Sequence, residues 1–531
     1  MPRPSLGQLI RVDLDMAGSA FRPLDARSAT VITARWKIGI CTVLAIFLCA
    51  SAHAHVGNKD VYQTVAAGPY KLFVTVRTPL VIPGIAEVEV RSTGAPIHAI
   101  TITPLPLTGE ASKHPPTPDA MKASSSDPAF FSGSLWLMAS GSWQVRLNIE
   151  GAGGSALASV PVPAVPTKIM GIQRPMATML SVLGCILVVG AVGIVMASVR
   201  EARLLPGSEA DSARRQHALI AGAAAFTLCA LAVYFAGKWW KVEAADYRAG
   251  MHRNSELRTT LQGNILHLSI GTFDTKNDGE WKQVENAQFL TDHGHLIHLY
   301  AIRWPEMDAV YHLHPIPDAK TGFSEMLPPM PPGIYHLYAD VVFRNGFPET
   351  ETATLAVRPG MTGAPLGSED ASAAPQPISA GPLGPSCRLP DGYSMEWEAP
   401  ASLKANTPYS FVFHLLDPKG KPAEDMQPYL GMPGHAAFVK SDGTAFAHTH
   451  PDGSAAMPAV MLANESSGIP MTGMDGRSEM SHSGAMDMSA EPVSSTVAFP
   501  YGFPSRGSYR IFIQMKHGST VETGVFDANV Q

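Results

Sequence analysis

The sequence has little charge, few cysteines and no excess of basic residues. Charged residues make up 16% of the 531-residue chain, whereas soluble domains average roughly 25%. Acidic residues outnumber basic ones by 45 to 39, which excludes a nucleic-acid-binding protein with its basic face. Four of the five cysteines lie in apolar segments, leaving Cys387 outside them. This distribution excludes a disulfide framework in the polar part of the chain.

The first apolar segment is typical of an export signal. Arg35 and Lys37 precede an apolar run from 38 to 50, and small-residue cleavage patterns follow. We therefore predict an N-terminal extension and signal peptide over residues 1–54. An uncleaved anchor is the alternative interpretation.

Two longer apolar segments predict a transmembrane helical hairpin. Residues 176–197 and 218–237 carry no charge, and each is long enough to cross the hydrocarbon core. The segment between them holds Arg200, Arg203, Arg214 and Arg215, which the positive-inside rule places in the cytoplasm. We predict helices at 174–199 and 218–238, a cytoplasmic loop at 200–217, and a multi-pass protein of the cytoplasmic membrane. Both large regions would then face the periplasm or the cell exterior.

The region 55–168 is predicted to be an antiparallel β-sandwich. Short runs alternate apolar and polar residues between Gly, Pro and Ser, a pattern typical of such folds. "GPYKLFVTV", "IPGIAEVEV" and "GSWQVRLNI" resemble the YtkA-like and FixH-like periplasmic sandwiches. The fold class predicted for the chain is mainly β, with immunoglobulin-like antiparallel sandwiches on either side of the two-helix hairpin.

The second outer region contains a divergent repeat. Gly294-His295 matches Gly434-His435, and the two H-x-H-P motifs, at 312–315 and 448–451, match each other. The closing strands at 333–335 and 507–509 also correspond. We define module 1 as residues 242–358 and module 2 as 387–531; a Pro/Gly/Ala/Ser-rich linker is predicted at 359–386.

The hairpin of module 2 has a defined expected register. Asp442-Gly443 is suited to a two-residue type I′ turn, which places His435 opposite His450. Residues two apart share a face of a strand, so His448 lies beside them. In module 1 the turn is longer, and an even register places His298 opposite His314, whereas an odd register places His295 there.

These histidines are predicted metal ligands, because neutral imidazole binds copper and zinc. The candidates in module 2 are His435, His448 and His450, with Met432 nearby. Those in module 1 are His312 and His314 with His295 or His298. The alternative is a sheet surface whose imidazoles hydrogen-bond neighbours or water.

A methionine-rich loop is predicted at 457–490 within module 2. It resembles the methionine-rich tracts of periplasmic copper-handling proteins, which bind Cu(I) through thioethers. Disordered low-complexity sequence is the alternative. Its candidate ligands are Met471, Met474, Met480, His482, Met486 and Met488.

The processed amino terminus is a further candidate. Cleavage after Ala54 would leave His55 first, an arrangement that resembles the first ligand of copper-resistance protein C. Cleavage after Ala52 would leave His53-Ala-His55, which encloses Cu(II) in a square plane.

These features predict a membrane-anchored periplasmic copper-binding protein that buffers, delivers or confers tolerance to copper. Cu(I) is the favoured ion, with Cu(II) at the processed terminus and zinc as the alternative. Expected partners are copper, the cytoplasmic membrane, and another periplasmic copper protein or an oxidase, without nucleic acid. Two alternatives stand: a metal-dependent periplasmic enzyme, although no H-E-x-x-H or G-x-S-x-G motif is present, or a non-metal scaffold for an oxidase or transporter.

Overall fold

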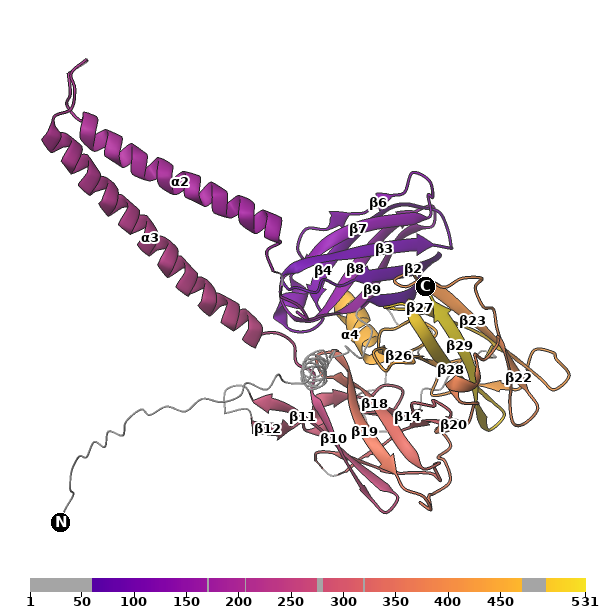
Figure 1. Cartoon of the computed structure of the whole chain (residues 1–531). Coiled ribbons are helices and arrows are strands. Elements are labelled where there is room, and N and C mark those ends of the chain that lie inside the picture. The colour runs from indigo at the N-terminus through magenta and orange to yellow at the C-terminus, as the bar shows by residue number, and fades with distance from the viewer. Residues whose placement is uncertain (1–59, 170, 206, 275–279, 319, 470–492) are drawn as a thin grey trace, which may run out of the picture. The chain divides into compact units, whose positions relative to one another are not determined.

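The computed structural model describes residues 60–169, 171–205, 207–274, 280–318, 320–469 and 493–531 (Figure 1). The predicted signal segment, His55 and the tract 471–488 lie outside these residues. The described chain is mainly β, with six antiparallel sheets and two long apolar helices in the middle of the sequence. The mainly-β prediction is therefore confirmed.

The first β region consists of two sheets that enclose an apolar core. Their strand orders are β1-β2-β3-β7-β6 and β5-β4-β8-β9. Alternate residues of β2, such as Leu72, Val74 and Val76, are buried, because successive side chains point to opposite faces of a strand. The elements are β1 (Val61–Ala67), β2 (Tyr70–Arg77), β3 (Gly84–Ser92), β4 (Ile97–Pro106), η1 (Glu110–Lys113), β5 (Asp119–Ala120), β6 (Lys122–Ala123), β7 (Phe130–Leu137), β8 (Gly141–Gly151) and β9 (Gly154–Ala164).

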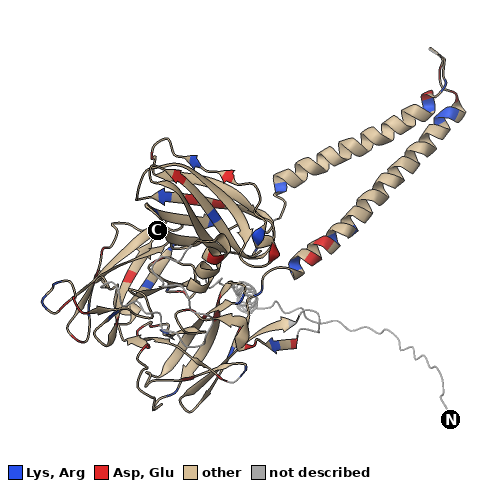
Figure 2. Cartoon of the chain, turned by 180° about the vertical axis from the view of Figure 1, so that it is seen from behind, with Lys and Arg blue, Asp and Glu red and all other residues tan. Residues whose placement is uncertain are grey.

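Two helices follow, α2 (Arg174–Glu201) and α3 (Ser212–Ala249). Charged side chains lie towards their ends, and none lies along their middle parts (Figure 2). The helices lie side by side, so closely that a Cβ on Gly222 would be 2.5 Å from Met196 Cγ. Both are longer than the predicted spans. α3 begins at Ser212 and not at 218, because the Asp211 carboxylate caps it by accepting from the Arg214 N–H at 2.8 Å. Each is long and apolar enough to cross a membrane.

Module 1 contains two sheets. Their orders are β10-β11-β17-β16, with β12 beside β11, and β13-β18-β14-β15-β20, with β19 beside β18. The elements are β10 (Glu256–Gln262), β11 (Ile265–Asp274), β12 (Glu280–Gln283), η2 (Asn286–Gln288), β13 (Phe289–Leu290), β14 (His298–Trp304), β15 (Val310–Leu313), β16 (Ile316–Pro317), β17 (Phe323–Met326), β18 (Gly333–Phe343), β19 (Pro348–Val357) and β20 (Ala371–Ala373).

Module 2 repeats this plan. Its sheets have the orders β21-β22-β23-β27 and β24-β28-β25-β26, with β29 beside β28. The elements are η3 (Ile378–Ala380), which precedes the module, β21 (Ser386–Arg388), β22 (Ser394–Trp397), β23 (Tyr409–Leu416), β24 (Met426–Gln427), β25 (His435–Lys440), β26 (Phe446–Thr449), α4 (Met457–Ser467), β27 (Thr496–Tyr501), β28 (Gly507–His517) and β29 (Thr520–Val530).

Two segments predicted to be irregular contain regular structure. Within the expected linker 359–386, β20 pairs with β15, and its small side chains pack inward: Ala371 is buried and Ala373 lies against the shared apolar cluster. The first part of the expected methionine-rich loop forms α4, which begins with Pro458 in its first turn and ends at Gly468 in the left-handed conformation.

One sheet of each module packs against the other. Each module has its own apolar core on one face of this sheet. On the opposite faces, residues from both modules form a shared cluster, in which Tyr338 stacks on Phe446 with ring centroids 4.3 Å apart. The hairpin strands β14 and β25 are consequently buried on both faces. The candidate ligands lie on this shared face.

Candidate metal centre

The two hairpins have the registers on which the predicted sites depend. In module 2, Ala437 pairs with His448 and Ala436 with Thr449, which is the expected register. The turn type was predicted wrongly: of Asp442 and Gly443 only Gly443 has positive φ, and its N–H donates to the Lys440 carbonyl at 2.9 Å, so the turn is not the two-residue type I′ turn. In module 1, Tyr300 pairs with His312, which is the even register of the two alternatives. His298 is therefore the residue opposite His314.

The structure aligns modules 1 and 2 differently from the alignment predicted from their sequences. His298 and His435 each begin the first hairpin strand, β14 and β25. A tight turn precedes each of them, in which His293 and Leu430 both have φ 52° and are followed by a glycine with positive φ. His298 thus corresponds to His435, and the match of Gly294-His295 with Gly434-His435 was wrong by three residues. The divergent residues between turn and strand hid this offset.

Eight histidine rings form a continuous group between the two sheets, which we call the His core; all but His295 have buried rings. Neighbouring ring centroids along it lie between 4.2 Å, for His295 and His314, and 5.4 Å, for His298 and His312 and for His435 and His448. The His core consists of His293, His295, His298, His312, His314, His435, His448 and His450.

The first group of possible ligands lies within module 1. His298, His312 and His314 each present one ring nitrogen, and these three atoms lie within 4.8 Å of one another. His298 Nε2 donates to the Asp292 carbonyl at 3.0 Å, so its Nδ1 carries the lone pair. That Nδ1 lies 3.2 Å from His312 Nε2.

The His312 tautomer follows from its other nitrogen. His312 Nδ1 donates to Gln514 Oε1 at 2.8 Å and lies 3.2 Å from the Tyr429 hydroxyl, which itself donates to the Glu369 carbonyl. The His312 Nε2 therefore also carries a lone pair, and two lone pairs face each other across 3.2 Å.

This arrangement fits a bound cation. Two imidazole nitrogens held tetrahedrally on one zinc ion at about 2.0–2.1 Å are themselves about 3.3 Å apart. The third nitrogen, His314 Nε2, is buried without a hydrogen-bond partner, while His314 Nδ1 lies 3.0 Å from Asp370 Oδ1. A carboxylate that orients a histidine in this way is typical of the shell around metal ligands.

The second group draws on both modules. His293 of module 1 and His435 and His450 of module 2 place one nitrogen each within 4.8 Å of the others. Both ring nitrogens of His435 are buried without a hydrogen-bond partner, as is His450 Nε2. Buried polar atoms of this kind are costly unless a ligand satisfies them, so these residues also fit a metal ion.

His448 and His295 lie beside these groups. The His448 ring centroid is 5.2 Å from that of His298 and 4.8 Å from that of His450. Its Nδ1 lies 3.2 Å from Asp340 Oδ2, and its Nε2 is buried without a partner. His295 Nε2 lies 2.9 Å from Glu369 Oε2. Both rings are additional donors at the edges of the two groups.

Burial disfavours the charged form of several imidazoles in the His core. Loss of water around the ring lowers the pKa of His298, His312, His435 and His450 well below the ordinary value, and neighbouring imidazoles lower it further. The pKa of His293 is lowered by the same burial. Neutral rings retain the lone pair that a metal ion needs.

The structure separates the predicted residues into three sets. His295, His298, His312, His314, His435, His448 and His450 lie together in the His core. Met432 is buried in the turn before β25, where its N–H donates to the Tyr429 carbonyl at 3.1 Å. His55 and the ligands at 471–488 lie outside the described residues, so they stay predictions.

Sequence reasoning missed His293 and the polar residues behind the rings. The H-G-H spacing at 293–295 was a usable signal, since Gly294 permits a tight turn and brings both rings to one place. No local sequence pattern predicted that Asp340, Asp370 and Gln514 contact the rings, because these residues come from distant segments of the chain.

A known family model matches only the C-terminal part of the chain. Residues 388–531 match the family described as "Domain of unknown function (DUF8832)". No curated protein matches.

Three solved structures illustrate how distant the structural likenesses are. A bacterial ice-binding adhesin is 5% identical, with 85% of this chain and 91% of that chain covered and a TM-score of 0.13. Escherichia coli alpha-2-macroglobulin is 10% identical, with 88% of this chain and 35% of that chain covered and a TM-score of 0.18. Parabacteroides merdae β-glucuronidase is 5% identical, with 89% and 78% covered and a TM-score of 0.14. Scores this low establish neither a shared fold nor a shared function.

Proposed function

We propose that this protein is a membrane-anchored periplasmic copper-binding protein that buffers, delivers or confers tolerance to copper. Copper would be held in the His core that the two modules share. The observation that carries the proposal is the pair of lone-pair nitrogens, His298 Nδ1 and His312 Nε2, that face each other at 3.2 Å. Without a cation or proton between them these atoms repel each other, whereas a metal ion turns the same geometry into a stabilising one.

The proposed location rests on the apolar segments. α2 has no buried residue, as expected for a helix whose surroundings are lipid. Trp239 and Trp240 of α3 are exposed beside lysines, which suits a membrane interface. With the Arg-rich loop in the cytoplasm and a signal in 1–54, both β regions would lie in the periplasm as immunoglobulin-like sandwiches. The YtkA-like and FixH-like resemblance agrees with this placement.

The donor set favours copper over zinc. The ligands are neutral imidazoles, and divalent copper lies above zinc in the affinity order for such sites. An apolar interior disfavours net charge, which favours the singly charged Cu(I). The thioethers predicted at 471–488 would also bind Cu(I), and His55 would offer a separate position for Cu(II). Zinc remains the alternative ion for the three-histidine groups.

A competitive titration tests the proposal. The full-length protein in lipid nanodiscs would be titrated with Cu(I), Cu(II) and Zn(II) against a chromophoric chelator. We expect two tightly bound copper equivalents, one for each three-histidine group, and weaker Cu(I) equivalents from the methionine-rich tract. The variant His414→Ala is the matched control, because His414 lies outside the His core and contacts Glu398 and Thr496. Binding no stronger than the chelator background would contradict the proposal and favour the non-metal scaffold.

A metal-dependent enzyme is the second candidate. The observation that favours it is a cavity that reaches His298, His448 and His450, because a catalytic metal site needs room for a substrate. Turnover of an added substrate only by the metal-loaded protein would support this alternative.

A further inference from the structure

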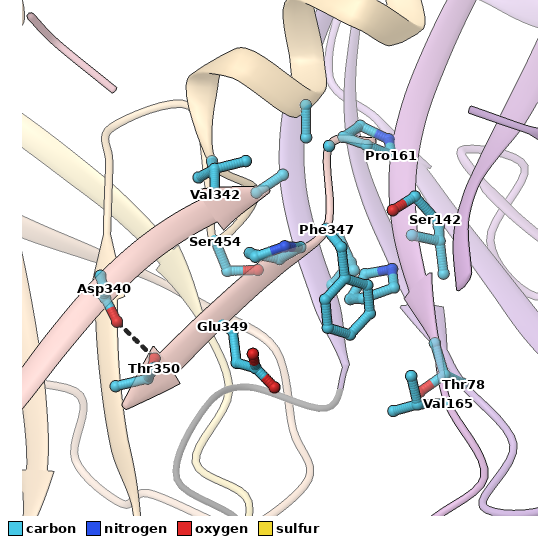
Figure 3. A pocket seen from close by; sticks show the side chains of 18 of the residues that line it. Thr78, Ser142, Pro161, Val165, Asp340, Val342, Phe347, Glu349, Thr350 and Ser454 are labelled. Atoms are coloured by element: carbon cyan, nitrogen blue, oxygen red, sulfur yellow. Dashed lines mark hydrogen bonds between the residues drawn. The ribbon is translucent and has the colours of Figure 1, made fainter. Parts of the chain in front are cut away.

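A cavity of about 370 Å³ lies between the first β region, α4 and the two modules. Figure 3 shows Ser142 and Pro161 on one side of it and Val342 and Ser454 on the other, with Phe347 between them. Its volume falls within the range of natural small-molecule sites.

The walls and one end of the cavity differ in chemistry. Trp143, Pro161 and Phe347 provide flat apolar walls. At that end, the Asp340 carboxylate lies 3.2 Å from His448 Nδ1, and the Ser454 hydroxyl accepts from the Tyr62 backbone N–H at 3.0 Å. The walls suit an aromatic ring, whereas this end offers hydrogen-bond acceptors to a hydroxyl group.

The charges on the lining exclude an anionic ligand. Asp340 and Glu349 line the cavity, and Lys168 is the one Lys or Arg among the described lining residues. A carboxylate or phosphate would meet like charges in an apolar setting. A sugar would leave hydroxyl groups unsatisfied against the walls. An uncharged molecule with one or two hydroxyl groups fits both constraints.

The rim of the cavity lies next to the ends of the long helices. Lys168 lies shortly before α2, which begins at Arg174, and His252 lies just after α3, which ends at Ala249. The His252 N–H donates to the Pro166 carbonyl at 3.3 Å and joins the two connecting segments. With the helices in a bilayer, this rim would lie close to the membrane surface. Uncharged aromatic alcohols concentrate at that surface, because their rings are apolar and their hydroxyl groups are polar.

We propose that this cavity binds a small uncharged aromatic alcohol, a phenol or a quinol, with its hydroxyl group directed at Asp340 and the His core. The ring lies against Trp143 and Phe347. The placement of the hydroxyl beside a copper ion rests on the proposed function, whereas occupancy of the cavity does not. This distinction makes the two proposals separable by experiment.

The test uses 4-fluorophenol as the probe and full-length protein in lipid nanodiscs. With Cu(II) bound, fluorine relaxation of the probe should rise in a saturable manner relative to the Zn(II)-loaded protein, because only a probe close to the paramagnetic ion relaxes rapidly. Probe dissolved in the bilayer lies far from the ion and gives no such effect. Fluorobenzene, which lacks the hydroxyl, and 4-fluorobenzoate, which is anionic, should each bind roughly tenfold more weakly or worse.

Cavity-filling variants locate the probe. Ala459→Phe in α4 and Val342→Phe in β18 each place a larger side chain in the cavity, and each should weaken binding by about tenfold or more. Met461→Phe is the matched control, since Met461 is an exposed residue of the same helix and is not a lining residue. Two independent filling variants guard against the case in which one of them fails to fold.

The outcomes separate the two proposals. Unsaturable relaxation in a copper-loaded protein, or equal affinity for fluorobenzene, would overturn the aromatic-alcohol proposal and leave copper binding intact. Unchanged affinity in both filling variants at full copper loading would also overturn it. If the protein takes up no copper, the proposed function fails. Probe binding would then be measured by saturation transfer in the metal-free protein, where its loss in both filling variants supports the cavity site and its persistence refutes it.

Discussion

Modules 1 and 2 have the same paired hairpin but supply different numbers of rings to the His core. Module 1 supplies five and module 2 supplies three. The difference lies in the turn before the hairpin, where Leu430 and Met432 occupy the positions of His293 and His295. The turn backbone is the same in both, with φ 52° at the first of these positions. One backbone therefore supports a ligand-bearing turn in one module and an apolar turn in the other.

The contacts between the modules are reciprocal. Asp340 of β18 pairs with His298, and Gln514 of β28 pairs with the equivalent His435. Asp340 lies 3.2 Å from His448 of the other module, and Gln514 lies 2.8 Å from His312 of the first. Each residue thus reaches the first histidine of the partner's H-x-H motif. Reciprocity of this kind is the rule for two-fold related surfaces, and the unequal turns break the equivalence.

The strongest test of this comparison removes one ligand from each group. His298→Ala should eliminate tight binding in the group within module 1, and His435→Ala should eliminate it in the shared group. Loss of one ligand from such a site is expected to weaken binding roughly a hundredfold. Each single variant should retain one tightly bound copper equivalent in a competitive titration, and the double variant should retain only the weaker equivalents. Two tightly bound equivalents retained in the double variant would place the metal elsewhere.

A second test places the turn residues of module 2 into the turn of module 1. His293→Leu gives module 1 the residue of module 2, and the shared group should then bind copper at least about tenfold more weakly. His295→Met should leave the stoichiometry unchanged, because His295 lies outside both three-histidine groups. Equal effects of the two variants in the same titration would contradict the assignment of His293 as a ligand and of His295 as a neighbouring residue.

A third and smaller effect on metal affinity is expected from the carboxylates that contact the imidazole rings. Asp340→Asn removes the charge beside His448, and Asp370→Asn does so beside His314. Loss of an orienting carboxylate typically costs about 10–100-fold in metal affinity. Asp370→Asn should act on the group of module 1. Its reference is Asp318→Asn, because Asp318 lies 3.6 Å from His267 Nδ1 and belongs to neither three-histidine group. Identical affinities for Asp370→Asn and its reference would show that this carboxylate does not orient a ligand.

The hairpins could be predicted from sequence because their signals are local. The Asp442-Gly443 turn fixed the register of module 2, and period-two spacing placed His448 and His450 on one face. The same local logic could not choose between the two registers of module 1, where the turn around Pro305 and Met307 is longer. Nor could it recognise that Leu430 is the counterpart of His293, since equivalence there lies in backbone conformation and not in residue type.

The sharing of the site between modules was beyond sequence reasoning. The linker composition suggested two independent bodies, whereas β20 adds to the sheet of module 1 and Asp370, just before it, contacts His314. The apolar residues that join the modules, such as Tyr338 and Phe446, sit in strands that read as ordinary core strands. Their second buried face becomes evident only when the two sheets are placed together.

A metal ion held by His293 together with His435 and His450 would couple occupancy of the shared group to docking of the two modules. A metal ion that binds only the docked arrangement stabilises it by an amount that grows with the logarithm of metal concentration. Copper would then act as a clamp between two halves of one chain. The rate at which a protease cuts the segment 359–386 would report the copper level to which the protein is exposed.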